Sequence, residues 1–325
     1  MNVAIIGSGL IGQKRAKSLG NARLAACVDI VLERASLLAK QFENCIAYTN
    51  WRDVIHRSDI DIVIVATLHA SLSEIAIEAV KAGKHVLIEK PAGRRAHELD
   101  PLLSTSKNGN PLIRVGFNHR YHRAFRKARE LVDQDYLGEL MFIRGRYGHG
   151  GRVGYDKEWR ANPSLSGGGE LIDQGIHLID LARWFLGDFT EIHGHAHTYY
   201  WDMPVDDNGF LLLKTAKKQT AFLHASCTEW KNLFSFEIYG KKGKIDIHGL
   251  GGSYGVERIA FYKMLRDMGP PETTMWEYPM PDDSFAVEFA EFLEDIQKTR
   301  QPNASIQDAH AALQIVEEIY RMSHL

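Results

Sequence analysis

The feature that most constrains the fold is the start of the chain, MNVAIIGSGLIG, where an apolar run leads directly into a glycine-rich turn. A continuous apolar run is typical of a parallel strand that is covered on both faces. Gly7, Gly9 and Gly12 follow the pattern G-x-G-x-x-G between this strand and a predicted helix over residues 10–20. At such a junction the first glycine permits a tight turn, the second allows close approach of a ligand, and the third allows helix and strand to pack.

The first third of the chain continues this alternation. Strands are predicted over residues 2–7, 23–30, 59–67, 85–90 and 112–118, and helices over residues 10–20, 31–42, 72–84 and 98–109. This order predicts an α/β domain with a doubly wound parallel sheet, the Rossmann arrangement. In that context the turn predicts a dinucleotide site formed by Gly7, Gly9, Leu10, Ile11 and Gly12, with a plain strand–helix turn as the alternative.

After residue 118 the pattern changes to longer strand-like runs separated by turns. Strands are predicted within residues 140–148, 191–201, 208–215, 219–230, 233–240 and 244–249, and helices over residues 124–135 and 305–324. These runs predict an α+β domain with a large, mostly antiparallel open sheet. The 325 residues suit two domains, and we place them at 1–118 and 119–325.

Composition excludes several classes of protein. The formal net charge is −2, so nucleic acid is not an expected partner. We expect no membrane association, because no window approaches about 20 uninterrupted apolar residues. The start of the chain shows no signal-peptide pattern, and the three cysteines show no C-x-x-C spacing. The expected location is therefore a reducing cytoplasm.

Two residues at strand ends extend the predicted dinucleotide site. Asp29 ends the second strand about 20 residues after the glycine turn, where an acid can bond the ribose 2′-hydroxyl of NAD and repel the 2′-phosphate of NADP. Capping of the following helix is the alternative, and Arg34 leaves some use of NADP open. Lys90 ends the fourth predicted strand, at the edge of the sheet where ligands of this fold bind, although a lysine there is usually only solvated.

The stretch SGGGELIDQGIHLIDLARW, residues 166–184, carries Asp173 and His177 four residues apart on a predicted helix. Side chains at this spacing are neighbours, about 5–6 Å apart at Cβ. The pair can hold the fold, bind a metal or move protons. Histidine suits a base that works near neutral pH, and no further metal ligand is evident. The run HGHAH, residues 193–197, puts three histidines on one face of a strand, for which a sheet face or subunit interface is preferred to a metal site.

Together, G-x-G-x-x-G at residues 7–12, Glu89-Lys90-Pro91 and the segment 167–184 resemble the glucose–fructose oxidoreductase/inositol dehydrogenase (Gfo/Idh/MocA) family. The resemblance extends over essentially the whole chain. It implies an N-terminal dinucleotide domain, a C-terminal domain whose open sheet often forms dimers or tetramers, and redox chemistry at a sugar or polyol carbon. It also implies a motif lysine at Lys90, a substrate-positioning acid at Asp173 and a general acid/base at His177.

Further contacts follow from the same resemblance. Thr67 and Glu89 are expected beside the cofactor, together with Lys90. Arg120, Trp159 and Arg160 are expected to bind substrate, together with Lys90, Asp173 and His177. One loop departs from the family pattern, because Leu68 stands where proline is usual, His69 where asparagine is usual, and Leu72 near an expected histidine.

We therefore expect an NAD-dependent oxidoreductase that transfers a hydride between a nicotinamide cofactor and a hydroxyl-bearing carbon of a sugar, sugar nucleotide or cyclic polyol. No metal is expected, and the expected assembly is a homodimer or homotetramer. Two rival functions remain. One is an NAD-dependent enzyme of the same fold that cleaves glycosides, and the other is a nucleotide-binding regulator without catalysis.

Overall fold

The computed structural model describes residues 1–106, 111–265, 267 and 269–324. Within these residues the chain folds into two compact units, Met1–Phe117 with Phe285–Leu313, and Asn118–Ser284 with Gln314–Leu325. No helix in the described part of the chain has the length and apolar character needed to cross a membrane. The predicted helix over 98–109 ends in residues 107–109, which lie outside the described residues.

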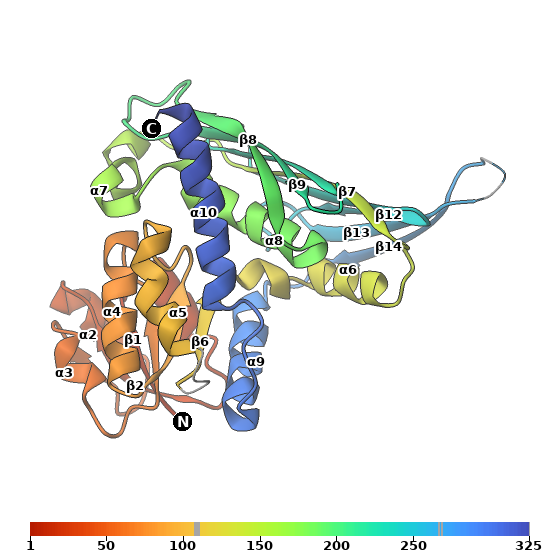
Figure 1. The fold of residues 1–325 in the computed structure, drawn as a ribbon. Helices are drawn as coiled ribbons and strands as arrows, with labels where there is room; N and C mark the ends of the chain where they lie inside the picture. The colour runs from red at the N-terminus through yellow and green to blue at the C-terminus, as the bar shows by residue number, and fades with distance from the viewer. Residues whose placement is uncertain (107–110, 266, 268, 325) are drawn as a thin grey trace. The chain divides into compact units, whose positions relative to one another are not determined.

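The first unit contains a parallel sheet with helices packed around it (Figure 1). In the described residues this sheet has six strands in the order β3-β2-β1-β4-β5-β6. Its strands are β1 (Asn2–Ile6), β2 (Arg23–Val28), β3 (Ile46–Tyr48), β4 (Ile62–Val65), β5 (His85–Glu89) and β6 (Ile113–Gly116). The central strands are buried along almost their whole length, as continuous apolar runs require. The predicted α/β class is confirmed.

Helices connect these strands. They are α1 (Leu10–Ala16), α2 (Leu32–Ala39), α3 (Arg52–Ile55), α4 (His69–Lys81) and α5 (Asp100–Ser106). The sequence analysis did not identify β3 or α3, because a three-residue strand and a four-residue helix are too short to show a periodic pattern. Helix α4 begins three residues earlier than predicted, with Leu68 at its N-cap.

A helix from the far end of the sequence completes the first unit. Phe289 and Phe292 of α9 (Ser284–Lys298) join the core cluster that contains Val3 and Ile5 of β1. Residues 285–313 thus belong with the dinucleotide unit, which differs from the predicted division at residue 118. The difference arises because α9 follows the strands of the second unit in sequence.

Buried charges bind α9 to the sheet of the first unit. Arg15 of α1 donates to Glu89 at 2.6 Å and also pairs with Glu288 of α9. Arg114 of β6 pairs with Asp295 of α9 at 2.5 Å. Removal of one partner would leave a buried charge uncompensated, which typically costs about 3–5 kcal/mol.

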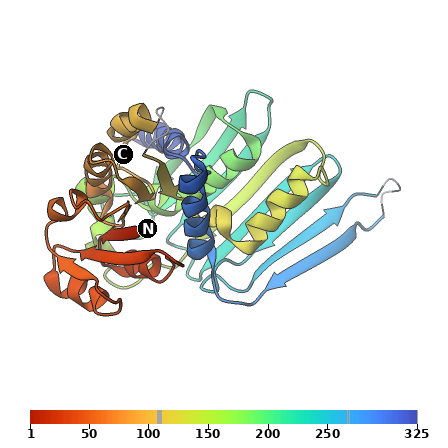
Figure 2. The same cartoon turned by 90° about the horizontal axis from the view of Figure 1, so that it is seen from below.

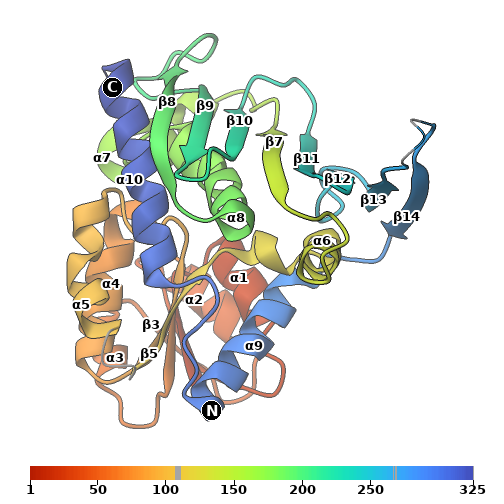
Figure 3. The same ribbon diagram turned by 45° about the vertical axis from the view of Figure 1, so that its right-hand side comes forward.

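The second unit contains an eight-stranded sheet in its described residues, with the order β14-β13-β12-β11-β7-β10-β9-β8 (Figure 3). Its strands are β7 (Leu140–Gly148), β8 (Phe189–His197), β9 (Asn208–Thr215), β10 (Thr220–Ser226), β11 (Leu233–Gly240), β12 (Gly243–His248), β13 (Glu257–Lys263) and β14 (Glu272–Tyr278). All described neighbours pair antiparallel except β10 and β7, so the predicted mostly antiparallel sheet is confirmed.

Helices cover one face of this sheet. Helices α6 (Arg123–Asp133) and α8 (Ile176–Leu186) pack against the same face (Figure 2). Residues of β11 alternate between buried and half-buried positions, as expected for a sheet with only one covered face. The unit also contains α7 (Pro163–Ser166) and the C-terminal part of α10 (Ile306–Ser323).

Candidate active site

The glycine turn of the first unit has the geometry that its sequence predicts. Gly7 has φ +99°, and a Cβ there would lie 2.3 Å from the Ala66 carbonyl oxygen. A Cβ on Gly12 would lie 1.8 Å from the Gly7 carbonyl oxygen, so strand and helix are in close contact. A Cβ on Gly9 would meet nothing within 4 Å. The backbone at Gly9, followed by Leu10 and Ile11 of α1, is therefore open to a ligand.

Asp29 is linked directly to this turn. Its Oδ2 accepts a hydrogen bond from the Ser8 backbone N–H at 3.0 Å, and its Oδ1 accepts one from the Val31 N–H at 2.9 Å. The second bond is similar to the one expected if Asp29 capped the following helix, although the N-cap residue of α2 is Val31. An ionised carboxylate has about four acceptor positions, so Asp29 retains capacity for a ribose hydroxyl.

The loop that departs from the family pattern opens helix α4. Thr67 is half-buried and its Oγ1 donates to the Leu68 carbonyl oxygen at 3.3 Å. His69 and Leu72 are both buried in the first turns of α4. Leu72 is thus a packing residue in the first unit and presents no titratable group.

Lys90 and Glu89 occupy different environments although they are adjacent. Glu89 ends β5 and is buried, with its Oε1 2.6 Å from Arg15 Nε. Lys90 follows the strand end and is half-buried. Glu89 therefore forms an ion pair within the first unit, and this ion pair supports the strand end next to Lys90.

In the second unit, the triple glycine serves close packing. A Cβ on Gly168 would lie 2.2 Å from the Tyr320 hydroxyl, and one on Gly169 would lie 1.9 Å from the Asp206 carbonyl oxygen. The Asp206 carboxylate accepts hydrogen bonds from the Gly169 and Leu171 N–H groups at 2.8 Å and from the Tyr320 hydroxyl at 2.7 Å. Asp206 thus fixes the start of the segment that carries Asp173.

The predicted regular helix is wrong at this start. Leu171–Gly175 forms a π-helical turn, and α8 begins only at Ile176. A Cβ on Gly175 would lie 3.1 Å from the Cβ of Ala225 in β10, so a glycine is needed where the wide turn meets the sheet. Wide turns of this kind occur frequently at functional sites.

Asp173 has a charged partner in this turn. Its Oδ2 accepts a hydrogen bond from Arg160 Nε at 2.7 Å, and Asp173 is buried while Arg160 is half-buried. The charge of Asp173 raises the pKa of Arg160. Two of the predicted substrate residues are therefore in contact, and the guanidinium of Arg160 in turn lies 4.6 Å from the ring centroid of Trp159.

His177 lies in the first turn of α8 among other rings. Its imidazole stacks on that of His119, with centroids 3.7 Å apart and an angle of 17° between the planes. The Tyr147 ring meets His177 edge-on at 6.3 Å. The sequence analysis assigned no role to His119 or Tyr147, since they lie 58 and 30 residues away from His177 in the chain.

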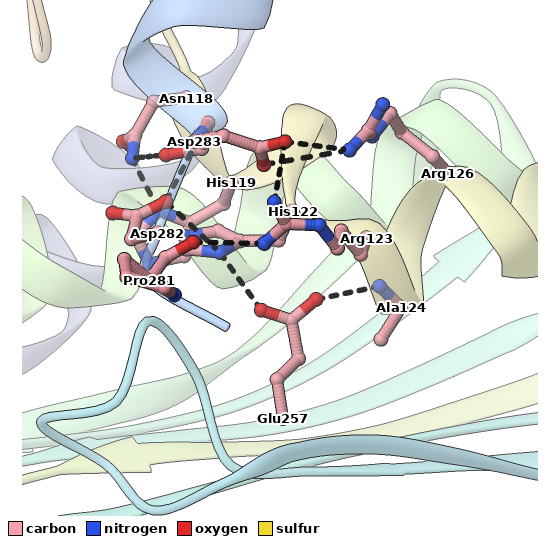
Figure 4. Close-up of polar contacts among 11 residues, drawn as sticks. Asn118, His119, His122, Arg123, Ala124, Arg126, Glu257, Pro281, Asp282 and Asp283 are labelled. Atoms are coloured by element: carbon pink, nitrogen blue, oxygen red, sulfur yellow. Dashed lines mark hydrogen bonds and ion pairs between the residues drawn. The ribbon is translucent and has the colours of Figure 1, made fainter. Parts of the chain in front are cut away.

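The turn that carries His119 is fixed by a polar network (Figure 4). The Asn118 amide donates to Ser284 Oγ at 2.9 Å, and the His119 Nδ1 lies 3.2 Å from Asn118 Oδ1. Next in the chain, His122 lies 3.1 Å from Glu257, whose other oxygen accepts the Ala124 N–H at 2.6 Å (Figure 4). These bonds hold the position of the ring that stacks on His177.

A second buried acid–base pair borders Asp173. His149 Nε2 lies 3.5 Å from Glu170 Oε2, and the Tyr155 hydroxyl donates to the same oxygen at 3.5 Å. Burial raises the pKa of Glu170. Burial lowers the pKa of His149, whereas the hydrogen bond to Glu170 and the charge of Glu170 raise it. Together the raising effects are larger, so the net shift of the pKa is upward. Sequence spacing could not reveal the pair, because 21 residues separate its members.

Arg120 is placed differently from the sequence-based expectation. Its guanidinium makes two bonds to Asp180 of α8, at 2.8 and 2.6 Å, and both side chains are buried. This bidentate pair holds the turn Asn118–Tyr121 against α8. We therefore assign Arg120 to supporting the site rather than to binding substrate.

The histidine run of β8 is exposed on one face, as its alternation predicts. His195 stacks on Phe210 of the neighbouring strand, with centroids 5.2 Å apart. Within the described residues, no group of three or more His, Cys, Asp or Glu side chains is arranged to hold a metal ion.

Comparison with known proteins decides the family. Residues 1–117 match a model described as an oxidoreductase family with an NAD-binding Rossmann fold, and residues 125–246 match the GFO/IDH/MocA C-terminal domain. The chain belongs to the GFO/IDH/MocA family. The predicted family is confirmed, as are an NAD-binding domain and membership of an oxidoreductase family.

Relatives within the GFO/IDH/MocA family are dehydrogenases of sugars and polyols. A levoglucosan dehydrogenase of Pseudarthrobacter phenanthrenivorans is 30% identical over 232 residues, 67% of this chain and 59% of the relative. Inositol 2-dehydrogenase 2 of Saccharopolyspora erythraea is 29% identical over 203 residues, 61% of this chain and 57% of the relative. The matches thus span less than two thirds of each relative's length.

Solved structures of similar fold cover more of the chain. A levoglucosan dehydrogenase in complex with NADH superposes with a TM-score of 0.88 at 24% identity, covering 99% of this chain and 98% of the other. An aldose-aldose oxidoreductase from Caulobacter crescentus, complexed with glycerol, superposes with a TM-score of 0.85 at 26% identity, covering 100% and 97%. The chain therefore shares its fold with these two proteins.

Proposed function

We propose that the protein is an NAD-dependent dehydrogenase that oxidises a secondary hydroxyl of a sugar, sugar nucleotide or cyclic polyol, or reduces the corresponding ketone. The observations that carry this proposal are the buried stack of His177 on His119 and the pairing of the buried Asp173, four residues earlier in the chain, with Arg160. These residues lie within residues 125–246 or next to them, the part of the chain that matches the GFO/IDH/MocA C-terminal domain, which supports their assignment as a base and a hydrogen-bonding acid.

The first unit supplies groups that fit NAD. The open backbone at Gly9 suits a pyrophosphate, and Asp29 beside Ser8 suits the adenosine ribose. Ile30, which follows Asp29, is apolar and 90% exposed, and so offers no charge to a 2′-phosphate. When bound, NAD supplies the hydride acceptor of the reaction.

The chain's own residues then supply proton transfer and orientation. We assign His177 as the base that takes the proton of the substrate hydroxyl. The stack with His119 limits rotation of the His177 ring, so the ring nitrogens keep one orientation for proton transfer. We assign Lys90 to hydrogen bonding of the substrate oxygen, where its positive charge favours an alkoxide as the proton leaves.

Asp173 is assigned to substrate positioning. One of its oxygens is bonded to Arg160, which fixes the position of the carboxylate. A fixed carboxylate can accept hydrogen bonds from sugar or polyol hydroxyls with little loss of side-chain entropy. Trp159 and Arg160 are assigned to the same substrate-binding region of the second unit.

The test is a search for substrate with the purified protein. NAD reduction is followed at 340 nm with levoglucosan, inositols, aldoses and UDP-sugars, and glycoside cleavage is followed in the same mixtures. We expect net NADH formation with at least one polyol or sugar, abolished by Lys90→Met. Sugar release without NADH accumulation would favour the glycoside-cleaving rival. NADH binding without turnover of either kind, across the full panel, would favour the regulator.

A further inference from the structure

Two cysteines of the first unit lie side by side. Cys27 is buried in β2, and Cys45 is half-buried one residue before β3. Their Sγ atoms are 3.5 Å apart, and both residues are free thiols. A separation of 18 residues concealed the pair from a search for C-x-x-C spacing.

The surroundings make the two thiols unequal. Hydrogen bonding with Cys27 and the nearby charges of Arg57 and Arg23 lower the pKa of Cys45, although burial opposes them. Hydrogen bonding with Cys45 and burial raise the pKa of Cys27. The Arg23 guanidinium also donates to the carbonyl of Asn44, next to Cys45, at 3.4 Å. The thiolate is the reactive form of cysteine, so Cys45 combines access with reactivity.

The position of Cys45 also permits movement. A disulfide has an S–S length of about 2.05 Å, so the two sulfur atoms must approach by about 1.5 Å. Cys45 lies outside the strand pairing, after Asn44 in a left-handed conformation with φ 53°. Strand β3 is a three-residue edge strand of the sheet and is therefore bonded on one side only.

We propose that Cys27 and Cys45 form a redox-sensitive pair, which a hydroperoxide converts reversibly into an intramolecular disulfide. Packing alone is the competing explanation, since buried cysteines often serve as small apolar residues. Packing explains Cys27 but does not require a half-buried thiol beside two guanidinium groups. The proposal is independent of the dehydrogenase function.

The chemistry needs hydroperoxide as the oxidant and proceeds in two steps. The Cys45 thiolate attacks one peroxide oxygen, the O–O bond breaks, and the released hydroxide takes up a proton to give water. Cys45 is then a sulfenic acid. The Cys27 sulfur attacks the Cys45 sulfur, the S–O bond breaks, and the departing hydroxide takes the Cys27 proton as a second water. Two thiols and one hydrogen peroxide thus give one disulfide and two waters.

The experiment uses the full chain, fully reduced and then freed of reductant. After hydrogen peroxide treatment, free thiols are alkylated and the digest is analysed by mass spectrometry. We expect a peptide pair linked through Cys27 and Cys45 that dithiothreitol separates. Cys227, which is buried in the second unit, serves as the internal reference. Because each unit of lower pKa gives tenfold more thiolate, Cys45 should react at least roughly tenfold faster than Cys227.

Variants separate the two roles. Cys27→Ala removes the resolving thiol, so a sulfenic acid should accumulate at Cys45 and be trapped by dimedone. Cys45→Ser should leave Cys27 unmodified, and Cys227→Ala should form the disulfide as the unaltered protein does. Thermal melts verify that each variant is folded. Equal reaction rates at Cys45 and Cys227, or oxidation of Cys45 without a link to Cys27, would overturn the proposal.

Discussion

The imidazole of His177 stacks on that of His119 with ring centroids 3.7 Å apart. The two rings come from α8 and from the turn Asn118–Tyr121, and the bidentate pair of Arg120 with Asp180 joins those same two elements. The stack therefore rests on a framework that does not depend on His177 itself. Replacement of His177 is then expected to change chemistry rather than the fold.

His177→Asn tests the assignment of the base. The variant should fold and bind NADH normally, because the proposed cofactor contacts lie in the first unit. Turnover should fall by roughly 10²–10⁴-fold, the contribution of general acid–base catalysis. Steady-state kinetics with an identified substrate, together with NADH fluorescence titration, provide the measurement.

A matched control for this experiment is His195→Asn, because His195 is an exposed histidine of the same unit that stacks on Phe210. It should retain turnover. If His177→Asn also turned over its substrate at a near-normal rate, His177 would be a structural residue, and its stack with His119 would serve packing.

We expect cofactor choice to depend on Asp29. The wild-type protein should bind NADH more tightly than NADPH by roughly 5- to 150-fold. This range corresponds to the about 1–3 kcal/mol that is lost when a hydrogen bond to a charged group cannot form. Asp29→Asn should reduce this preference, because the amide accepts a hydroxyl but does not repel a phosphate. Fluorescence titration of both cofactors measures the ratio. Glu78→Gln, on the exposed face of α4, is the control. Tighter binding of NADPH by the wild type would contradict the assignment.

The sequence was sufficient to predict the parts of the site whose interactions are local in the chain. The turn at Gly7 and the acid at Asp29 are linked through Ser8, and a parallel βαβ unit places them together by its own geometry. The second unit is different, because its site depends on partners that are far apart in sequence. Asp206 holds Leu171, at the start of the Asp173 segment, from 35 residues away, and no pattern of spacing indicates such a contact.

The same limit explains why the sequence analysis did not assign residues 285–313 to the first unit. The contact between Arg15 and Glu288 joins residues 273 apart in the chain. The sequence analysis predicted no helix over residues 284–298, and the unit that this helix joins depends on where the chain returns after the second sheet. Likewise, the π-helical turn at Leu171–Gly175 lies where Gly175 packs close to Ala225 of β10, a contact that local propensity does not encode.

The uncovered face of the eight-stranded sheet is expected to mediate self-association. Phe222 of β10 lies directly opposite Leu212 of β9, and both are exposed, at 49% and 47%. Exposed apolar pairs on an open sheet favour an interface. We expect a dimer or tetramer by light scattering at micromolar concentration.

Phe222→Glu should shift this equilibrium toward the monomer, because it would bury a charge in the interface. Val153→Lys changes an exposed apolar residue of the same unit outside the sheet, and should leave the assembly intact. A monomeric wild-type protein would exclude this role for the sheet.

The pair of Glu170 and His149 predicts how stability depends on pH. Both residues have a raised pKa in the folded protein, so folding favours their protonated forms. Their contribution to the free energy of unfolding is fully present below the pKa values of the unfolded chain, about 4.3 for glutamate and 6.5 for histidine. It is lost as the pH rises through the raised pKa values of the folded protein.

In Glu170→Gln the carboxylate that raises the pKa of His149 is absent, so burial should keep the ring neutral. That variant should gain stability as the pH rises through about 6.5.

The melting temperature of Glu170→Gln minus that of the wild type should therefore increase steadily from pH 5.5 to pH 8. Differential scanning fluorimetry at constant ionic strength provides the measurement. Glu139→Gln removes an exposed carboxylate of the same unit, paired only at the surface with Lys241, and should show no such trend. A constant difference for Glu170→Gln across this range would mean that neither member of the pair exchanges a proton on folding.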